Sequence, residues 1–124
     1  MYAYIGCRTT KERNARGKGI RVYEINNGAW ELKQIAKGQV NPSYLCLNEK
    51  QDRLYAIHGD FSEVSAYKVA EDGTLTYQNT TETHGTNPVH LTIDRTGKMV
   101  VCRKSADRRR FCDSNRRRWI PWKD

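Results

Sequence analysis

The stretch Asn41-Pro42-Ser43-Tyr44-Leu45-Cys46-Leu47 decides the fold, because the chain repeats it 46 positions later as Asn87-Pro88-Val89-His90-Leu91-Thr92-Ile93. Three other pairs of segments repeat in the same order at offsets of 44 to 46: Ile20–Ile25 with Val64–Val69, Asn26–Gly28 with Glu71–Gly73, and Leu54–Ile57 with Met99–Cys102. A fixed period of about 45 residues that carries four short segments is typical of one blade of a β-propeller.

Each repeated segment is predicted to be a strand. Apolar residues such as Ile20 and Val22 alternate with polar ones, and the gaps hold the turn formers Gly, Asn and Asp. No stretch shows a sustained helical period. The expected strands of the first blade are 2–7, 19–25 and 30–35; those of the second are 42–48, 53–58, 63–69 and 75–80; Asn87 opens the third.

Several motifs together resemble a known family. The run Tyr4-Ile5-Gly6-Cys7-Arg8-Thr9, followed in order by Gly17–Ile20, Asn41–Leu45, Asp72–Leu75 and Pro88–Leu91, is similar to the opening of the lactonase family of seven-bladed β-propellers. That family includes bacterial 6-phosphogluconolactonases and fungal 3-carboxymuconate cyclases. The resemblance implies an all-β fold, a partial β-propeller with about two four-stranded antiparallel blades of a seven-bladed parent. Residues 1–102 would form blades 1 and 2 and the start of blade 3, about the first third of a family member.

The resemblance also implies an activity, which is hydrolysis of 6-phosphogluconolactone to 6-phosphogluconate in the pentose phosphate pathway, without a cofactor. Its candidate catalytic residue is His90, near the start of an inner strand, because a histidine can take a proton from water near neutral pH. The competing interpretation is a buried polar residue between blades, matched by Tyr44 one blade earlier.

Arg8 and Lys18 are candidate substrate-binding residues, since cations can hold a sugar phosphate near the mouth of the channel. The competing interpretation is that both are ordinary solvated loop residues. His58 and His84 have no carboxylate or cysteine at ligand spacing, so we expect loop residues there and no metal site.

The last 22 residues break the pattern. Residues 103–124 contribute +6 of the net charge of +8 and show no alternation, so we expect a basic, disordered tail outside the propeller. Our hypothesis is a reading frame shifted near Val101. Read one base later, the codons of Trp119 and Trp122 each give glycine, and permitted codons around them give Asp-Gly-Ser-Leu-Gly, similar to Asp72–Leu75.

The alternative function is non-enzymatic: a propeller-derived scaffold, or a nucleic-acid binder that uses the arginines of the tail. Out-of-frame text explains the broken repeat better, so we do not expect a nucleic-acid partner. A small sugar lactone is the expected partner, and we expect the chain itself to be inactive because later blades would carry the rest of the site. Without an apolar run or secretory start, we expect a cytoplasmic protein with no membrane segment.

Sequencing the DNA that encodes residue 101 and the bases after it tests the shifted frame. We expect the frame one base later to continue the 46-residue period with further strand and Asp-Gly turn motifs. An intact frame followed by DNA that encodes no such blades would show that the hypothesis is wrong.

Overall fold

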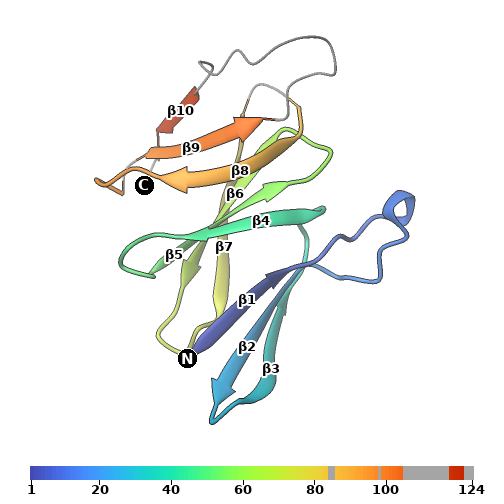
Figure 1. Ribbon diagram of the computed structural model, residues 1–124, viewed down its shortest axis with the longest axis vertical. Coiled ribbons are helices and arrows are strands. Elements are labelled where there is room, and N and C mark those ends of the chain that lie inside the picture. The colour runs from blue at the N-terminus through green and yellow to red at the C-terminus, as the bar shows by residue number, and fades with distance from the viewer. Residues whose placement is uncertain (84–85, 98, 105–117, 122–124) are drawn as a thin grey trace.

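A computed structural model describes residues 1–83, 86–97, 99–104 and 118–121. In these ranges the chain forms three antiparallel sheets (Figure 1). The first contains β1 (Tyr2–Gly6), β2 (Ile20–Asn26) and β3 (Ala29–Ala36); the second β4 (Pro42–Leu47), β5 (Arg53–His58), β6 (Glu63–Val69) and β7 (Leu75–Glu82); the third β8 (Pro88–Ile93), β9 (Met99–Lys104) and β10 (Arg118–Pro121). The described helical structure is one 3₁₀ turn, Lys11–Arg13. The predicted partial all-β propeller is confirmed.

The sequence repeat is also a repeat of backbone geometry. The Asn48 N–H donates to the carbonyl of Arg53 at 3.0 Å, and the Asp94 N–H donates to that of Met99 at 3.0 Å. The inner strands β4 and β8 each contain a β-bulge at their second residue, Ser43 and Val89. A bulge re-aims the side chains that follow it. The bulges therefore set the directions of Tyr44 and His90, the residues that follow them. These two residues are aligned in the sequence repeat.

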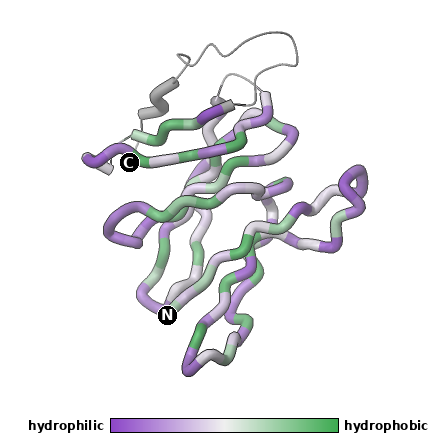
Figure 2. The backbone as a smooth tube through the Cα atoms, viewed as in Figure 1, coloured by the Kyte–Doolittle hydropathy of each residue, from purple (hydrophilic) through white to green (hydrophobic). Residues whose placement is uncertain are grey.

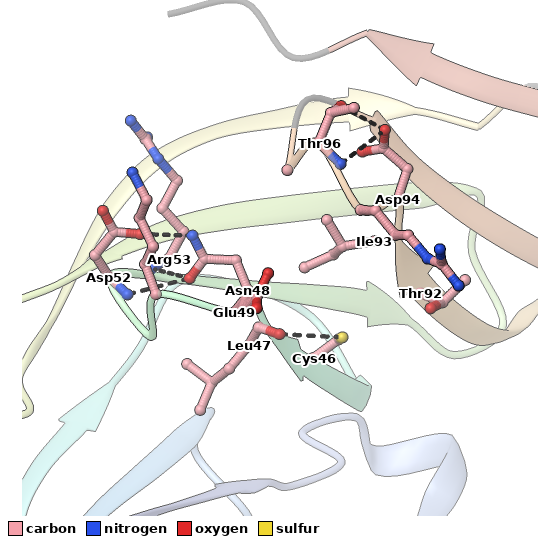
Figure 3. Close-up of a pocket in the computed structure, with 13 residues that line it drawn as sticks. Cys46, Leu47, Asn48, Glu49, Asp52, Arg53, Thr92, Ile93, Asp94 and Thr96 are labelled. Carbon is pink, nitrogen blue, oxygen red and sulfur yellow. Dashed lines mark hydrogen bonds between the residues drawn. The ribbon is translucent and has the colours of Figure 1, made fainter.

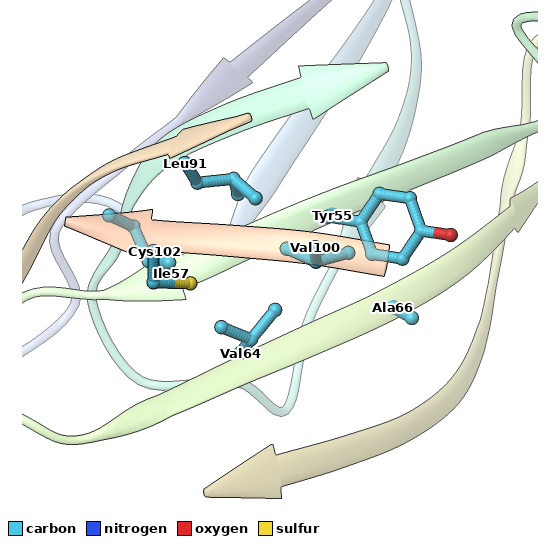
Figure 4. Packing of buried hydrophobic residues seen from close by; sticks show 7 residues of the cluster. All are labelled: Tyr55, Ile57, Val64, Ala66, Leu91, Val100 and Cys102. Atoms are coloured by element: carbon cyan, nitrogen blue, oxygen red, sulfur yellow. The ribbon is translucent and has the colours of Figure 1, made fainter. Parts of the chain in front are cut away.

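The central strands β5 and β6 of the second sheet are buried on both faces, and each face has its own apolar cluster. Towards the first sheet, Leu54, Ala56 and Tyr67 pack against Ile20 and Val22. Towards the third sheet lies the cluster of Tyr55, Ile57, Val64, Ala66, Leu91, Val100 and Cys102 (Figure 4). Figure 2 shows hydrophobic residues along these strands and hydrophilic residues at the turns. The period-two alternation of the sequence thus supplies the packing between sheets.

Tyr67 is a polar exception inside the first of these clusters. Its side chain is 2% exposed, and its hydroxyl has no hydrogen-bond partner among the described residues. Burial disfavours the charged phenolate and raises the pKa of Tyr67 to about 12. The side chain therefore stays neutral at any physiological pH.

Part of the basic tail forms a strand. Arg118–Pro121 forms β10, which pairs antiparallel with β9 from Arg118 opposite Cys102 to Pro121 opposite Met99. This strand was not predicted from the sequence, and the disorder of the tail stays a prediction. β10 occupies the place beside β9 that β6 occupies beside β5. Arg103 and Lys104, the first two residues of the predicted tail, end β9, and residues 105–117 and 122–124 lie outside the described residues.

An asparagine before each inner strand joins consecutive blades. Asn41 is 1% exposed, and its Oδ1 accepts the backbone N–H groups of Thr9 at 2.8 Å and Thr10 at 3.2 Å, both in the β1–β2 loop. Its Nδ2 donates to the Thr10 hydroxyl at 3.2 Å. One blade later, the Oδ1 of Asn87 accepts the N–H of Asp60 at 3.4 Å. We call Asn41 and Asn87 the interblade asparagines.

Both interblade asparagines have left-handed backbone, with φ of 45° at Asn41 and 52° at Asn87. Asparagine and glycine tolerate this region far better than other residues. Only asparagine also brings an amide that can bond the preceding blade. The position therefore needs both properties of the side chain.

We predict that Asn41→Gly lowers the free energy of unfolding by about 1–2 kcal/mol, because it leaves two partly buried N–H groups of the β1–β2 loop without an acceptor. Glycine accepts the positive φ, so the loss reports hydrogen bonding and not backbone strain. Urea unfolding of the 124-residue chain measures it. Asn26→Ala, at the exposed end of β2, is the control and should change stability by less than about 0.5 kcal/mol. Equal effects of the two substitutions would contradict the assignment.

Candidate functional site

The blades have two ends, and the candidate residues gather at one of them. We call it the loop end: it contains the β1–β2 loop, the β5–β6 turn and the interblade asparagines, which hydrogen bonds connect. The opposite end, the turn end, contains the turns 48–52 and 94–97. In Figure 1 the β1–β2 loop projects from the body of the strands.

His90 lies on β8, directly after the bulge, and pairs with Arg103 of β9. β8 is the edge strand of its sheet and contacts β4, the edge strand of the second sheet. The His90 side chain is exposed, and its ring centroid is 4.8 Å from that of Tyr44. The two aligned residues therefore contact each other across blades. This placement leaves His90 open to water, as a general base requires, and the residue is not buried between blades as the competing interpretation expected.

Arg8 lies in the β1–β2 loop, where it shares the carboxylate of Asp60 with a second arginine, Arg13, that the sequence analysis did not single out. Arg8 Nη1 donates to Asp60 Oδ2 at 3.1 Å. Arg13 donates to the same carboxylate from Nε at 2.7 Å and from Nη2. Asp60 thus bridges two cations at the tip of the β5–β6 turn. Lys18 is exposed where the same loop returns to β2, next to Gly19, whose carbonyl accepts the Cys7 N–H at 3.1 Å. No contact described here joins its side chain to that of Arg8.

The two arginines control the ionisation of Asp60. The hydrogen bond from Arg13 does most to hold the pKa of the Asp60 carboxyl below its usual value, and the charges of Arg13 and Arg8 add to it. Asp60 is therefore ionised at neutral pH. Its fixed negative charge keeps both guanidinium groups at the loop end.

Asp60 also links the basic loop to the strand of the candidate histidine. Its backbone N–H is bound by Asn87, which stands immediately before β8. Three blades thus meet at one residue: the loop of the first, the turn of the second and the inner strand of the third. Sequence reasoning missed Arg13 and Asp60, because their contact joins residues 47 positions apart that carry no motif.

His58 corrects one expectation. It is the last residue of β5, 1% exposed, and not a loop residue. Its Nδ1 faces the carbonyl oxygen of Val40, and its Nε2 is 2.7 Å from Ser65 Oγ. A serine beside a histidine can act as a nucleophile, but Ser65 is 0% exposed, so no substrate reaches it. The pair therefore satisfies buried polar groups. His84 lies outside the described residues.

A cleft of about 790 Å³ lies at the turn end, between the turns after β4 and β8 (Figure 3). Its polar groups mostly serve their own turns: Asn48 Nδ2 donates to Asp52 at 2.6 Å, and the Thr96 hydroxyl donates to Asp94. His90, Arg8 and Lys18 do not line it. Size alone therefore does not make this cleft the reaction site.

Neither a metal-binding cluster nor a membrane-spanning helix is found in residues 1–83, 86–97, 99–104 and 118–121. No group of three or more His, Cys, Asp or Glu residues there could hold a metal ion. No helix in those ranges has the length and apolar character needed to cross a membrane.

Comparisons with known proteins agree with the β-propeller fold of the described strands. The family model described as lactonase, 7-bladed beta-propeller, matches residues 2–104. A 6-phosphogluconolactonase of Formosa agariphila is 27% identical over 114 residues, which cover 84% of this chain and 31% of that protein.

Solved structures give the same result. A candidate 6-phosphogluconolactonase of Bacteroides fragilis aligns with a TM-score of 0.70 and 30% identity, over 82% of this chain and 28% of its own. One from Bacteroides uniformis aligns with a TM-score of 0.69 and 27% identity, over 82% of this chain and 29% of its own. The periplasmic gluconolactonase of Pseudomonas aeruginosa, at 21% identity and a TM-score of 0.65, shares the fold. The chain spans less than a third of the length of each relative.

We predict that Arg13→Gln raises the pKa of Asp60 towards the ordinary value near 3.9, because it removes the hydrogen bond that lowers it most. A carboxylate with a lowered pKa stabilises the fold above its unfolded-state pKa, and this contribution is lost as the pH falls through the folded-state value. Carboxyl ¹³C NMR titration measures the shift. The internal control is Asp72, whose pKa is lowered mainly by hydrogen bonds from Thr74 and should not move. An unchanged pKa of Asp60 in the Arg13→Gln variant would contradict the proposed bridge between Asp60 and the two arginines.

Proposed function

We propose that this chain, which belongs to the lactonase family of seven-bladed β-propellers, supplies the opening blades of a sugar-lactone hydrolase. The observation that carries the proposal is the placement of His90, exposed on an edge strand and joined through Asn87 and Asp60 to the basic β1–β2 loop. The proposed substrate is 6-phosphogluconolactone, the product is 6-phosphogluconate, and the pathway is the pentose phosphate pathway. The names of the curated relative and of the Bacteroides proteins support this choice.

In the proposed reaction, His90 takes a proton from water as the water oxygen attacks the lactone carbonyl carbon. The tetrahedral intermediate then collapses, and the bond between the carbonyl carbon and the ring oxygen breaks. The imidazolium returns its proton to the ring oxygen, which becomes a hydroxyl. The products are the open-chain acid and the regenerated histidine. A cation must stabilise the oxyanion of the intermediate, and Arg8 and Lys18 bind the phosphate.

The described residues hold only part of such a site. The channel of a seven-bladed propeller is shared by all its blades, and this chain spans 31% of the Formosa enzyme. We therefore propose that the 124-residue chain alone is inactive, since a base without an oxyanion partner provides little of the needed stabilisation. A cytoplasmic location is part of the proposal, and cell fractionation tests it.

We predict that the 124-residue chain hydrolyses 6-phosphogluconolactone no faster than water does. A chain extended in the shifted reading frame should be active, and His90→Gln in it should lower kcat by about two orders of magnitude, because glutamine hydrogen-bonds but does not take the proton. Loss of lactone against an enzyme-free blank measures the rate. Thr92→Ala, on the same strand, is the matched control and should retain activity.

Each result decides a different part of the proposal. Activity of the 124-residue chain would contradict its inactivity. Full activity of the extended His90→Gln chain would remove His90 from the reaction while leaving lactone hydrolysis intact. If no extended chain hydrolyses the lactone, the proposal that the full protein is a sugar-lactone hydrolase is wrong.

A further inference from the structure

The β1–β2 loop contains basic residues beyond Arg8 and Lys18, the two to which the proposed reaction gives a role. Residues 8–18 include five basic residues and one acidic residue. Lys11, Arg13 and Arg16 are exposed in this loop. Only two of the five cations meet Asp60 in the contacts described above. The loop and Asp60 together therefore carry a net positive charge.

The Asp60 carboxylate orders the two arginines but uses only some of their N–H donors. A guanidinium has five N–H donors. Arg8 gives one to Asp60, and Arg13 gives two. Four donors of Arg8 and three of Arg13 therefore do not bond to Asp60, and the same carboxylate holds both guanidinium groups. Two ordered guanidinium groups match the geometry by which proteins bind phosphate oxygens.

The position of this pair is fixed by backbone contacts. Asn41 binds the N–H groups of Thr9 and Thr10, directly after Arg8. A Cβ atom placed on Gly59 would lie 3.3 Å from Arg8 Nη1 and 3.2 Å from Ser43 Cβ. The Arg8 guanidinium therefore packs beside the start of the inner strand β4. A ligand held there sits at the loop end, beside the start of β4.

We infer that Arg8 and Arg13 together bind the phosphate dianion of the sugar lactone, with Asp60 as the positioning residue that holds both guanidinium groups. The inference rests on the proposed function for its substrate. It adds Arg13 to the binding site and gives Asp60 a role. It also makes this loop the part of the chain that selects phosphorylated over unphosphorylated lactones.

The experiment measures binding by the 124-residue chain, so it does not depend on catalysis. 6-Phosphogluconate, gluconate and inorganic phosphate are titrated into the chain, and the amide signals of residues 8–18 are followed by NMR. We expect 6-phosphogluconate and phosphate to shift these signals and gluconate to leave them in place. Arg13→Gln should weaken 6-phosphogluconate binding about tenfold, the typical cost of one charge-assisted hydrogen bond. Arg16→Gln, which removes the same charge from the same exposed loop, should change it less than twofold.

Asp60→Asn separates positioning from simple electrostatics. Removing a negative charge would strengthen phosphate binding if Asp60 merely competed for the arginines. A positioning role predicts the reverse, about fivefold weaker binding or more. Asp60 has φ of 73°, a conformation that asparagine tolerates well, so the turn should persist. Unchanged amide signals of β5 and β6 would verify that.

The outcomes are distinct. Equal losses in Arg13→Gln and Arg16→Gln, or tighter binding in Asp60→Asn, would overturn the inference. Binding of a single-stranded oligonucleotide in preference to 6-phosphogluconate would also overturn it and favour a polyanion surface. If phosphate binds as expected and no extended chain hydrolyses the lactone, the phosphate site stands and the proposed reaction fails.

Discussion

The rest of the structure depends on the hydrogen bonds that the interblade asparagines make to the preceding blade. A strand that leaves one blade must start the next at a fixed height and angle, and apolar packing alone does not set either. Asn41 does so by turning the backbone at a positive φ and bonding two N–H groups of the preceding loop. The bulge at Ser43 and the direction of Tyr44 follow from that start. Asn87 repeats the arrangement one blade later, and the direction of His90 follows in the same way.

Apolar packing then stabilises what the asparagines align. The second sheet is covered on both faces, whereas the first sheet leaves Ile5, Trp30 and Leu32 between 41% and 57% exposed on the face opposite Ile20 and Val22. In a closed ring that face would meet another blade. The Tyr23–Trp30 ring contact, with centroids 5.7 Å apart, gives the exposed indole one neighbour within its own sheet.

The strands could be predicted from the sequence because their signal is local. Arg53–His58 and Glu63–Val69 were placed to the residue, since alternation and turn formers bound them on both sides. The placement of His90 on an inner edge strand also followed from the repeat. Its chemical role stays a prediction, as do those of Arg8 and Lys18. The Asp60 bridge and the burial of His58 could not be predicted, because both depend on contacts between distant segments. The strand at Arg118–Pro121 was missed because it has no alternating pattern, and its pairing with β9 defines it.

The direction of the interblade bonds has a consequence for how the chain acquires its shape during synthesis. Each asparagine secures a loop made earlier: Asn41 lies 32 residues after Thr9, and Asn87 lies 27 residues after Asp60. A ribosome adding about 5–20 residues per second delivers the securing residue roughly 1–6 seconds after the loop it binds. A nascent blade therefore waits for its successor before its own loop is fixed, and order passes along the polypeptide from the amino end in steps of one blade.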